Sequence, residues 1–138
     1  MSEYKRPLPQ IFEFTKPFWE SCKKGVLMVQ RCKACGGYQW YPRTSCVRCG
    51  SMEVEWVQSK GEGSVYSYTV VRRVVANSPD FQRDIPFVVA EVDLDEGVRI
   101  YARVEGVKPE DVRVGMRVKV SFDNVTPEIS LYKFQPAK

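Results

Sequence analysis

Four of the five cysteines stand in two copies of one short motif, Cys-x-x-Cys-Gly, with ten residues between the copies' cysteine pairs. A Cys-x-x-Cys turn directs two thiolates toward one point, and two such turns complete a tetrahedral shell of four sulfurs for zinc. The glycine after each pair, Gly36 and Gly50, supplies the backbone freedom that lets amides turn toward the sulfurs. The motifs therefore predict one structural zinc per chain, with the ligands Cys32, Cys35, Cys46 and Cys49.

Other chemistry is open to these cysteines but is less well supported. Iron in a rubredoxin-like site is the alternative metal, because thiolates also bind iron. A single Cys-x-x-Cys could be a redox pair, and two disulfides could form in an oxidising compartment. The duplicated glycines favour a metal, and no signal peptide is seen at Met1, so we expect a cytoplasmic protein. Cys22 lies outside the motifs, and we expect it to be a small buried hydrophobe.

The composition argues against an enzyme. The 138 residues include no histidine, so the commonest general base near neutral pH is missing and a Ser-His or Cys-His nucleophile is excluded. No phosphate-binding loop or paired-carboxylate motif is present, and turn formation explains Asp93 and Asp95. No apolar run reaches 18 residues, so we expect no membrane span.

The charge is distributed unevenly along the chain. The net charge is +4, yet residues 1–60 carry ten Lys or Arg against five Asp or Glu, whereas residues 61–138 carry eleven against twelve. The positive charge therefore belongs to the half with the cysteines. It either solvates an exposed surface or attracts an anionic partner, such as a nucleotide phosphate.

The segments around the cysteines predict a zinc ribbon. A helix is expected between Thr15, as its N-cap before Pro17, and Gly25, as its stop. Phe18, Trp19 and Cys22 give this helix an apolar face. Three strands then alternate with the two cysteine turns, and we place them at 26–31, 38–41 and 53–57.

The second half predicts a small β-barrel. Two glycines within residues 60–63 mark a boundary, so we expect one unit at 1–60, with arm, helix and ribbon, and another at 61–138. A hairpin turn is expected at residues 95–97, a polar loop at 77–84 and a helical turn at 109–114. Five strands with one short helix fit an OB-fold, although periodicity also fits another small barrel or sandwich. The strands are expected at 64–75, 86–94, 98–104, 117–122 and 128–134.

The whole arrangement resembles the acyl-CoA-associated zinc-ribbon and OB-fold proteins, the family catalogued as domain of unknown function 35. The resemblance covers the chain from about Phe14 onward. It implies an accessory protein that acts with a thiolase or a related acyl-CoA enzyme and helps to bind a CoA ester. Some members bridge a thiolase to hydroxymethylglutaryl-CoA synthase in archaea, and others pair with steroid side-chain hydratases or aldolases. The matching segments are 18–19, 25–27, 29–36, 41–43, 46–50, 61–71, 86–97 and 114–122.

A CoA ester needs cations for its phosphates and an aromatic or apolar wall for the rest. Trp40, Tyr41, Arg43 and Arg48 lie within or beside the cysteine loops, and Arg72 and Arg73 close the first barrel strand. We take these six as candidate ligand-binding residues. The two aromatics could instead pack the ribbon onto the barrel, and the arginines could be solvated charges.

A nucleic-acid-binding module is the alternative function. Zinc ribbons and OB-folds both occur in such proteins, and Tyr66, Tyr68 and Phe87 could stack on bases. Against it, the barrel half has a net charge of −1, whereas binding to a nucleic-acid backbone is driven by neutralising phosphates. A stand-alone enzyme or redox protein is the third and weakest hypothesis.

Overall fold

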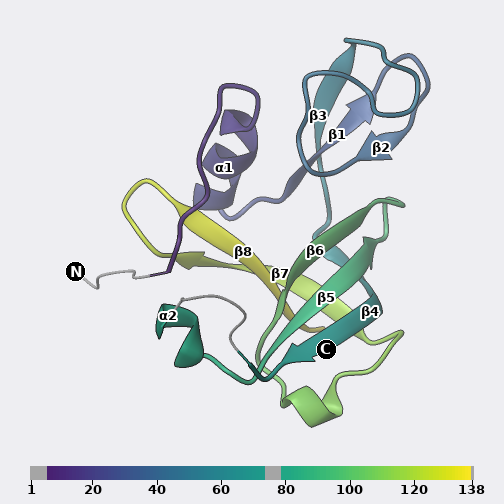
Figure 1. The fold of residues 1–138 in the computed structure, drawn as a ribbon. Coiled ribbons are helices and arrows are strands. Elements are labelled where there is room, and N and C mark those ends of the chain that lie inside the picture. Colours follow the sequence, from purple (N-terminus) through teal and green to yellow (C-terminus); the bar gives the residue numbers. More distant parts are fainter. Residues whose placement is uncertain (1–5, 74–78, 138) are drawn as a thin grey trace.

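The fold consists of a three-stranded sheet, a closed five-stranded barrel and a helix beside both (Figure 1). It is seen in a computed structural model that describes residues 6–73 and 79–137. The mainly β architecture predicted from the sequence is confirmed. The elements in chain order are α1 (Lys16–Lys23), β1 (Met28–Cys32), β2 (Tyr38–Gln39), β3 (Val54–Gln58), β4 (Glu62–Val71), α2 (Pro79–Gln82), β5 (Phe87–Leu94), β6 (Arg99–Val104), the 3-10 turn η1 (Pro109–Asp111), β7 (Arg117–Asn124) and β8 (Ser130–Pro136).

Helix α1 begins and ends where the sequence predicts, and Thr15 stands at the N-cap position as predicted, but its hydroxyl does not cap the helix. No side-chain bond reaches the helix amides. The Thr15 hydroxyl instead accepts a hydrogen bond from the Phe12 N–H at 2.9 Å and donates one to the Phe12 carbonyl at 3.2 Å, so it fixes the turn that leads into the helix. Gly25 ends α1 with a φ of +77°, a conformation that glycine adopts without strain. The predicted apolar face of α1 is buried.

The ribbon is an antiparallel sheet in the order β2-β1-β3. Its central strand places Gln30 opposite Gln39 on one side and opposite Trp56 on the other. Strand β2 is only two residues long and ends before Trp40, whereas the sequence predicted a strand through Tyr41. Beyond the end of the strand, the Trp40 and Tyr41 rings pack against Phe18 of α1 at centroid distances of 6.3 and 5.9 Å.

The barrel closes in the order β4-β5-β6-β8-β7. Its neighbours are antiparallel except β6 and β8, which pair in parallel at Val104 and Phe134. This is the predicted OB-fold, and its five strands and η1 match the predicted elements. Two details differ: the expected polar loop contains helix α2, and β4 ends at Val71. The last residues expected in that strand, 74–75, lie outside the described part of the chain.

The ribbon and the barrel meet at five aromatic side chains, which we call the aromatic seam: Phe18, Trp19, Trp40, Tyr41 and Tyr132. Tyr132 comes from the barrel and lies 5.6 Å from Phe18 and 5.7 Å from Trp40, centroid to centroid. Trp19 donates a hydrogen bond from Nε1 to the Tyr41 hydroxyl at 3.0 Å. One continuous buried cluster runs from Phe18 and Val29 to Phe134, so the two sheets share a core through α1.

The link between the sheets, residues 59–61, is held by the β5–β6 turn. Glu96 accepts hydrogen bonds from the Ser59 hydroxyl at 2.8 Å and from the Lys60 N–H at 2.9 Å. The division of the chain at residue 60 into two units stays a prediction. No helix in the described part of the chain is long and apolar enough to cross a bilayer.

Candidate metal centre and the adjoining pocket

The four predicted cysteine ligands converge on one point in the ribbon. Their sulfurs all lie within 4.8 Å of one another. Cys32 Sγ is 3.6 Å from Cys49 Sγ, and Cys35 Sγ is 3.7 Å from Cys46 Sγ. A tetrahedral zinc with Zn–S bonds of about 2.3 Å places its sulfurs roughly 3.8 Å apart, so the geometry fits the ion. None of the four is in a disulfide.

The two cysteine turns have the same backbone conformation. The Gly36 N–H donates to the Cys32 carbonyl at 2.8 Å, and the Gly50 N–H donates to the Cys46 carbonyl at 3.0 Å. Both glycines have positive φ, +77° and +78°, which confirms the reason given for their place in the motif. The repeated motif thus builds two equivalent halves of one site.

Backbone amides favour thiolates at Cys46 and Cys32. The N–H groups of Cys49 and Arg48 lower the pKa of Cys46 to about 6, and the Cys35 N–H is the largest contribution that lowers the pKa of Cys32. At Cys49 the Ser51 N–H acts in the same direction, but the other three sulfurs and burial raise its pKa to about 11. Burial alone raises the pKa of Cys22 to about 12, so that thiol stays protonated near neutral pH. Negative sulfurs this close together need a cation between them.

Sequence reasoning missed a pair of glutamines that positions the second cysteine turn. Gln39 Nε2 donates to Gln30 Oε1 at 2.8 Å and to the Ser45 carbonyl at 3.1 Å, and Gln39 Oε1 accepts from the Val47 N–H at 2.9 Å. Gln30 bonds both the N–H and the carbonyl of Arg43. Both glutamines are buried. The sequence offered one indication of this pair: each glutamine stands in a predicted strand next to a cysteine turn.

The structure separates the six candidate ligand-binding residues into three places. Trp40 and Tyr41 lie in the aromatic seam. Arg43 and Arg48 are exposed on the loop of the second cysteine turn, and the Arg48 side chain lies over Gly37, beside Cys35 Sγ.

Arg72 and Arg73 follow the far end of β4. Ten residues of strand separate them from the link to the ribbon, about 30 Å at roughly 3.3 Å per residue.

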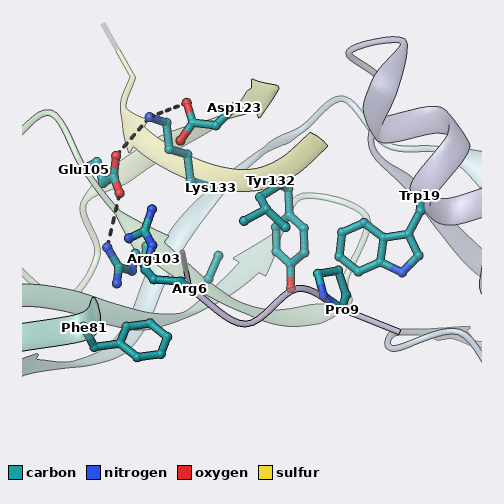
Figure 2. Close-up of a pocket in the computed structure, with 11 residues that line it drawn as sticks. Arg6, Pro9, Trp19, Phe81, Arg103, Glu105, Asp123, Tyr132 and Lys133 are labelled. Carbon is teal, nitrogen blue, oxygen red and sulfur yellow. Dashed lines mark hydrogen bonds and ion pairs between the residues drawn. The ribbon is translucent and has the colours of Figure 1, made fainter. Parts of the chain in front are cut away.

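A pocket of about 280 Å³ opens on the other side of the aromatic seam (Figure 2). Trp19 and Tyr132 form one wall, with Pro9 of the N-terminal arm beside them, and Phe81 of α2 lies across from them. Sequence reasoning did not find this pocket, because its walls come from the arm, from both helices and from three barrel strands. The lining residues are Arg6, Pro9, Trp19, Phe81, Ala102, Arg103, Glu105, Asp123, Leu131, Tyr132 and Lys133.

The charges in the pocket cancel one another. Lys133 Nζ lies 2.9 Å from Glu105 and 3.0 Å from Asp123. Arg103 lies 3.1 Å from Asp84, which also pairs with Arg6. The polar end of the pocket is therefore closed by a network of ion pairs, and its other end is aromatic.

The fold and the site define a class, the proteins in which a four-cysteine zinc ribbon precedes an OB-fold barrel. Residues 19–55 match the family model described as the rubredoxin-like zinc ribbon domain of ChsH2, and residues 56–123 match that of its C-terminal OB-fold domain. The chain belongs to this ChsH2 (DUF35) family, and its cysteine group is the family's zinc site. The resemblance seen in the sequence is thereby confirmed.

Individual relatives carry different names. A "DUF35 domain-containing scaffold protein" of Methanocaldococcus jannaschii is 34% identical over 86% of this chain and 87% of its own. "Benzoylsuccinyl-CoA thiolase subunit BbsA" of Geobacter metallireducens is 31% identical over 95% and 90%. A "probable enoyl-CoA hydratase alpha subunit" of Thermomonospora curvata is 35% identical over 96% of this chain, which spans only 40% of that relative's length.

A solved structure described as "Ltp2-ChsH2(DUF35) aldolase" has the same fold. The match has a TM-score of 0.82 at 33% identity and covers 95% of this chain and 100% of that one.

Proposed function

We propose that this protein is a non-catalytic accessory subunit of a thiolase-type acyl-CoA enzyme. In this role it holds the assembly together and helps the enzyme to bind a CoA ester. The observation that carries this proposal is the full-length match to the DUF35 chain of the aldolase structure. The relative named as a thiolase subunit, which this chain matches along nearly its whole length, supports the thiolase class. The relatives named as scaffold proteins support an accessory role.

The chemistry of the site supports a role without catalysis. Four thiolates fill the tetrahedral shell, so the zinc supplies structural cross-linking and has no open position for water or substrate. The chain has no histidine. Among the described residues, the carboxylates beside the pocket are held in ion pairs with Arg6, Arg103 and Lys133, which leaves none of them placed as a base.

Binding of a CoA ester would divide between two places. The pocket has an aromatic end and neutralised charges, which suit the uncharged pantetheine arm better than phosphates. The phosphates need cations that are not already neutralised, and Arg43 and Arg48 on the exposed cysteine loop have no ion-pair partner among the described residues. We therefore keep these two arginines as the proposed phosphate contacts, and we assign Trp40 and Tyr41 to supporting the wall behind Trp19 and Tyr132.

Nucleic-acid binding is less well supported by the same surface. Tyr66 and Tyr68 are exposed on the barrel, as stacking would require. Arg99 lies 3.5 Å from the Tyr66 ring centroid but is bonded to Asp93 at 2.6 Å, and Phe87 is half-buried under Arg103. The arginines next to this strand that have no ion pair with a described residue, Arg72 and Arg73, lie past its end at Val71 and not alongside the rings, so phosphate binding has little support. We propose the cytoplasm as the location of the protein. This compartment is reducing, so it keeps the cysteines available for zinc.

Titration calorimetry with acetyl-CoA tests the proposal, with a mixed-sequence single-stranded oligonucleotide in parallel. Acetyl-CoA should bind weakly to the chain alone, more tightly when a thiolase-type enzyme of the same organism is present, and less tightly at high salt. Leu131→Trp should narrow the pocket and weaken binding, whereas Val114→Trp, at an exposed position, should not. Arg43→Ala should weaken the salt-dependent part of the binding.

Three outcomes would contradict this proposal. Tight binding of the oligonucleotide without any binding of acetyl-CoA would favour the nucleic-acid function. Turnover of an acyl-CoA by the isolated chain, lost on a point mutation in it, would show an enzyme. Failure to associate with any thiolase-type enzyme would remove the accessory role.

A further inference from the structure

Strand β4 leaves one of its two edges open over six residues. Its first residues, Glu62 to Ser64, pair with β7, and Val65 exchanges hydrogen bonds with Gly115 and Met116 at 2.8 and 2.9 Å. A bulge between Val65 and Ser67 then turns the strand away from β7. From Tyr66 to Val71 the strand pairs with β5 alone, and no described residue bonds its other edge.

The open edge is built from residues that form β-strands readily. Its sequence, Tyr-Ser-Tyr-Thr-Val-Val, contains no charge, no proline and no glycine, and tyrosine, threonine and valine all favour strands. Tyr66 is 51% and Tyr68 38% exposed. An uncharged, exposed edge of this kind is a ready template for another strand.

Three other strand edges in the described part of the chain are protected. Strand β2 is very short, and β3 carries Glu55. Strand β6 carries Arg99 and Arg103, and its Tyr101 carbonyl accepts a hydrogen bond from the Tyr132 hydroxyl at 2.9 Å. Short length, charged side chains and covering groups are the usual means of keeping edges unpaired. The β4 edge has none of these three, so it is free to pair with another strand.

The far end of this edge is strongly basic. Arg72 and Arg73 follow Val71 directly, both are exposed, and neither has an ion pair with a described residue. A strand that pairs with residues 66–71 passes these two arginines at one end. Carboxylates at that end would complete the contact.

A second copy of this chain fits the edge poorly. Two copies paired antiparallel along 66–71 would place Arg72 of each opposite Val65 of the other. Val65 is already bonded to the 115–116 turn, which is flanked by the exposed Arg113 and Arg117. Asp95 neutralises Arg117, so the like charge that such a dimer would bring toward Arg72 at each end is that of Arg113, and like charges in opposition are unfavourable.

We propose that the β4 edge, Tyr66–Val71, docks an extended segment of a partner protein as an added strand, with acidic residues of that segment against Arg72 and Arg73. Six residues of strand span about 20 Å, and alternate residues offer both an N–H and a carbonyl, so roughly six backbone hydrogen bonds can form. This is strand addition, in which the backbone gives affinity and flanking side chains give specificity. The inference concerns protein docking and does not depend on CoA binding.

The test uses a library of random twelve-residue peptides selected against the full-length, zinc-loaded chain. We expect the selected peptides to alternate β-branched or aromatic residues and to carry Asp or Glu at one end. Hydrogen exchange should show at least tenfold protection of amides within 66–71 when the best peptide is added, with no change in β7 and β8. The double variant Arg72→Glu with Arg73→Glu should lose at least tenfold in affinity, whereas Lys23→Glu with Lys24→Glu, the same charge change on α1, should lose less than twofold.

A second pair of variants separates edge pairing from contact with the sheet face. Thr69→Lys places a charge on the open edge strand and should abolish peptide binding. Tyr101→Lys places the same charge on β6, where Tyr101 is exposed and pairs with Glu91 of β5, and should leave peptide binding intact. The proposal is overturned if no peptide is selected, if protection appears elsewhere, if both lysine variants behave alike, or if residues 66–71 are covered by self-association in sedimentation measurements.

Discussion

The ribbon and the barrel bury their side chains to different extents. In the barrel, β5 alternates strictly, with Val88, Ala90, Val92 and Leu94 all buried. In the ribbon, no residue of β3 is fully buried. The barrel can therefore draw its stability from apolar burial, whereas the small ribbon sheet needs a cross-link in place of a core. The four sulfurs supply it.

The two regions are nevertheless joined, because α1 packs against β1 of the ribbon and against β7 and β8 of the barrel. Two kinds of stabilisation thus meet at the aromatic seam. Substitution of a metal ligand should destabilise the ribbon alone, whereas substitution in the aromatic seam should destabilise both the ribbon and the barrel.

Loss of a cysteine ligand should have the largest effect and should be confined to the ribbon. Cys35→Ser removes one of four thiolates, and because binding of structural zinc to such small units is worth on the order of 10 kcal/mol, we expect metal content to fall from about one zinc per chain to near zero. Amides of β1 to β3 should lose protection in hydrogen exchange while β5 stays protected. Elemental analysis and exchange measured by mass spectrometry check this.

Cys22→Ala is the matched control, since this thiol lies outside the metal group and is buried. Its metal content should equal that of the parent protein. Loss of the metal in this variant, or retention of it in Cys35→Ser, would mean that the ligands are wrongly assigned.

Truncation of the Phe18 side chain should destabilise both the ribbon and the barrel, unlike loss of a cysteine ligand. Its side chain is fully buried and contacts Trp19, Trp40, Tyr41 and Tyr132. Phe18→Ala should cost roughly 3–5 kcal/mol of unfolding free energy, as such core truncations do. Chemical denaturation followed by exchange at β1 and at β8 should show parallel losses, and an unchanged barrel would show that the seam does not couple the two parts.

A smaller effect, confined to the ribbon, is expected from Gln39→Ala. The substitution removes the partners of the Val47 N–H and the Ser45 carbonyl, at a cost of roughly 0.5–1.5 kcal/mol for each hydrogen bond. Zinc should be removed by a chelator faster than from the parent protein. Gln58→Ala, an exposed glutamine of β3, should behave like the parent, and equal rates for both variants would dismiss the glutamine pair as a support of the site.

Features that depend on residues close together in the sequence were predictable, and features that depend on contacts between distant residues were not. The cysteine group was predictable because each half is a local motif and tetrahedral sulfur geometry allows few alternatives. The strand count and the hairpin at 95–97 followed from period-two patterns and turn chemistry. The position of Thr15 at the N-cap was predictable, but the bonding of its hydroxyl was not, because the Phe12 backbone competes for it.

The pocket and the open edge were out of reach for a different reason. Trp19 and Tyr132 are far apart in the chain, and the pocket between them depends on the closure of the barrel and on where α1 packs. The edge depends on a bulge at Val65 that no motif marks. Arg72 and Arg73 were noticed as cations, but only the fold shows that they end an unpaired strand and lie far from the ribbon.

The smallest expected effect is that of acid, which should destabilise the ribbon and the barrel at different pH values. On the barrel, the group concerned is Asp95. Arg117 donates to both of its carboxylate oxygens, at 2.9 and 2.8 Å, and this bonding holds the pKa of Asp95 below its ordinary value of 3.8. A lowered pKa means that the pair stabilises the folded barrel above pH 3.8 and that this contribution is lost as the pH falls through the lowered value. The ribbon should fail earlier in the same titration, because protons compete with zinc for its thiolates.

In the Arg117→Gln variant, the carboxyl resonance of Asp95 should show a pKa closer to 3.8, while zinc should be released at the same pH as from the parent protein. The control variant Arg113→Gln should change neither the pKa of Asp95 nor the pH of zinc release. If the pKa of Asp95 stays low without Arg117, the ion pair is not its cause, and if barrel and ribbon unfold at one pH, the two regions are less independent than their different cores indicate.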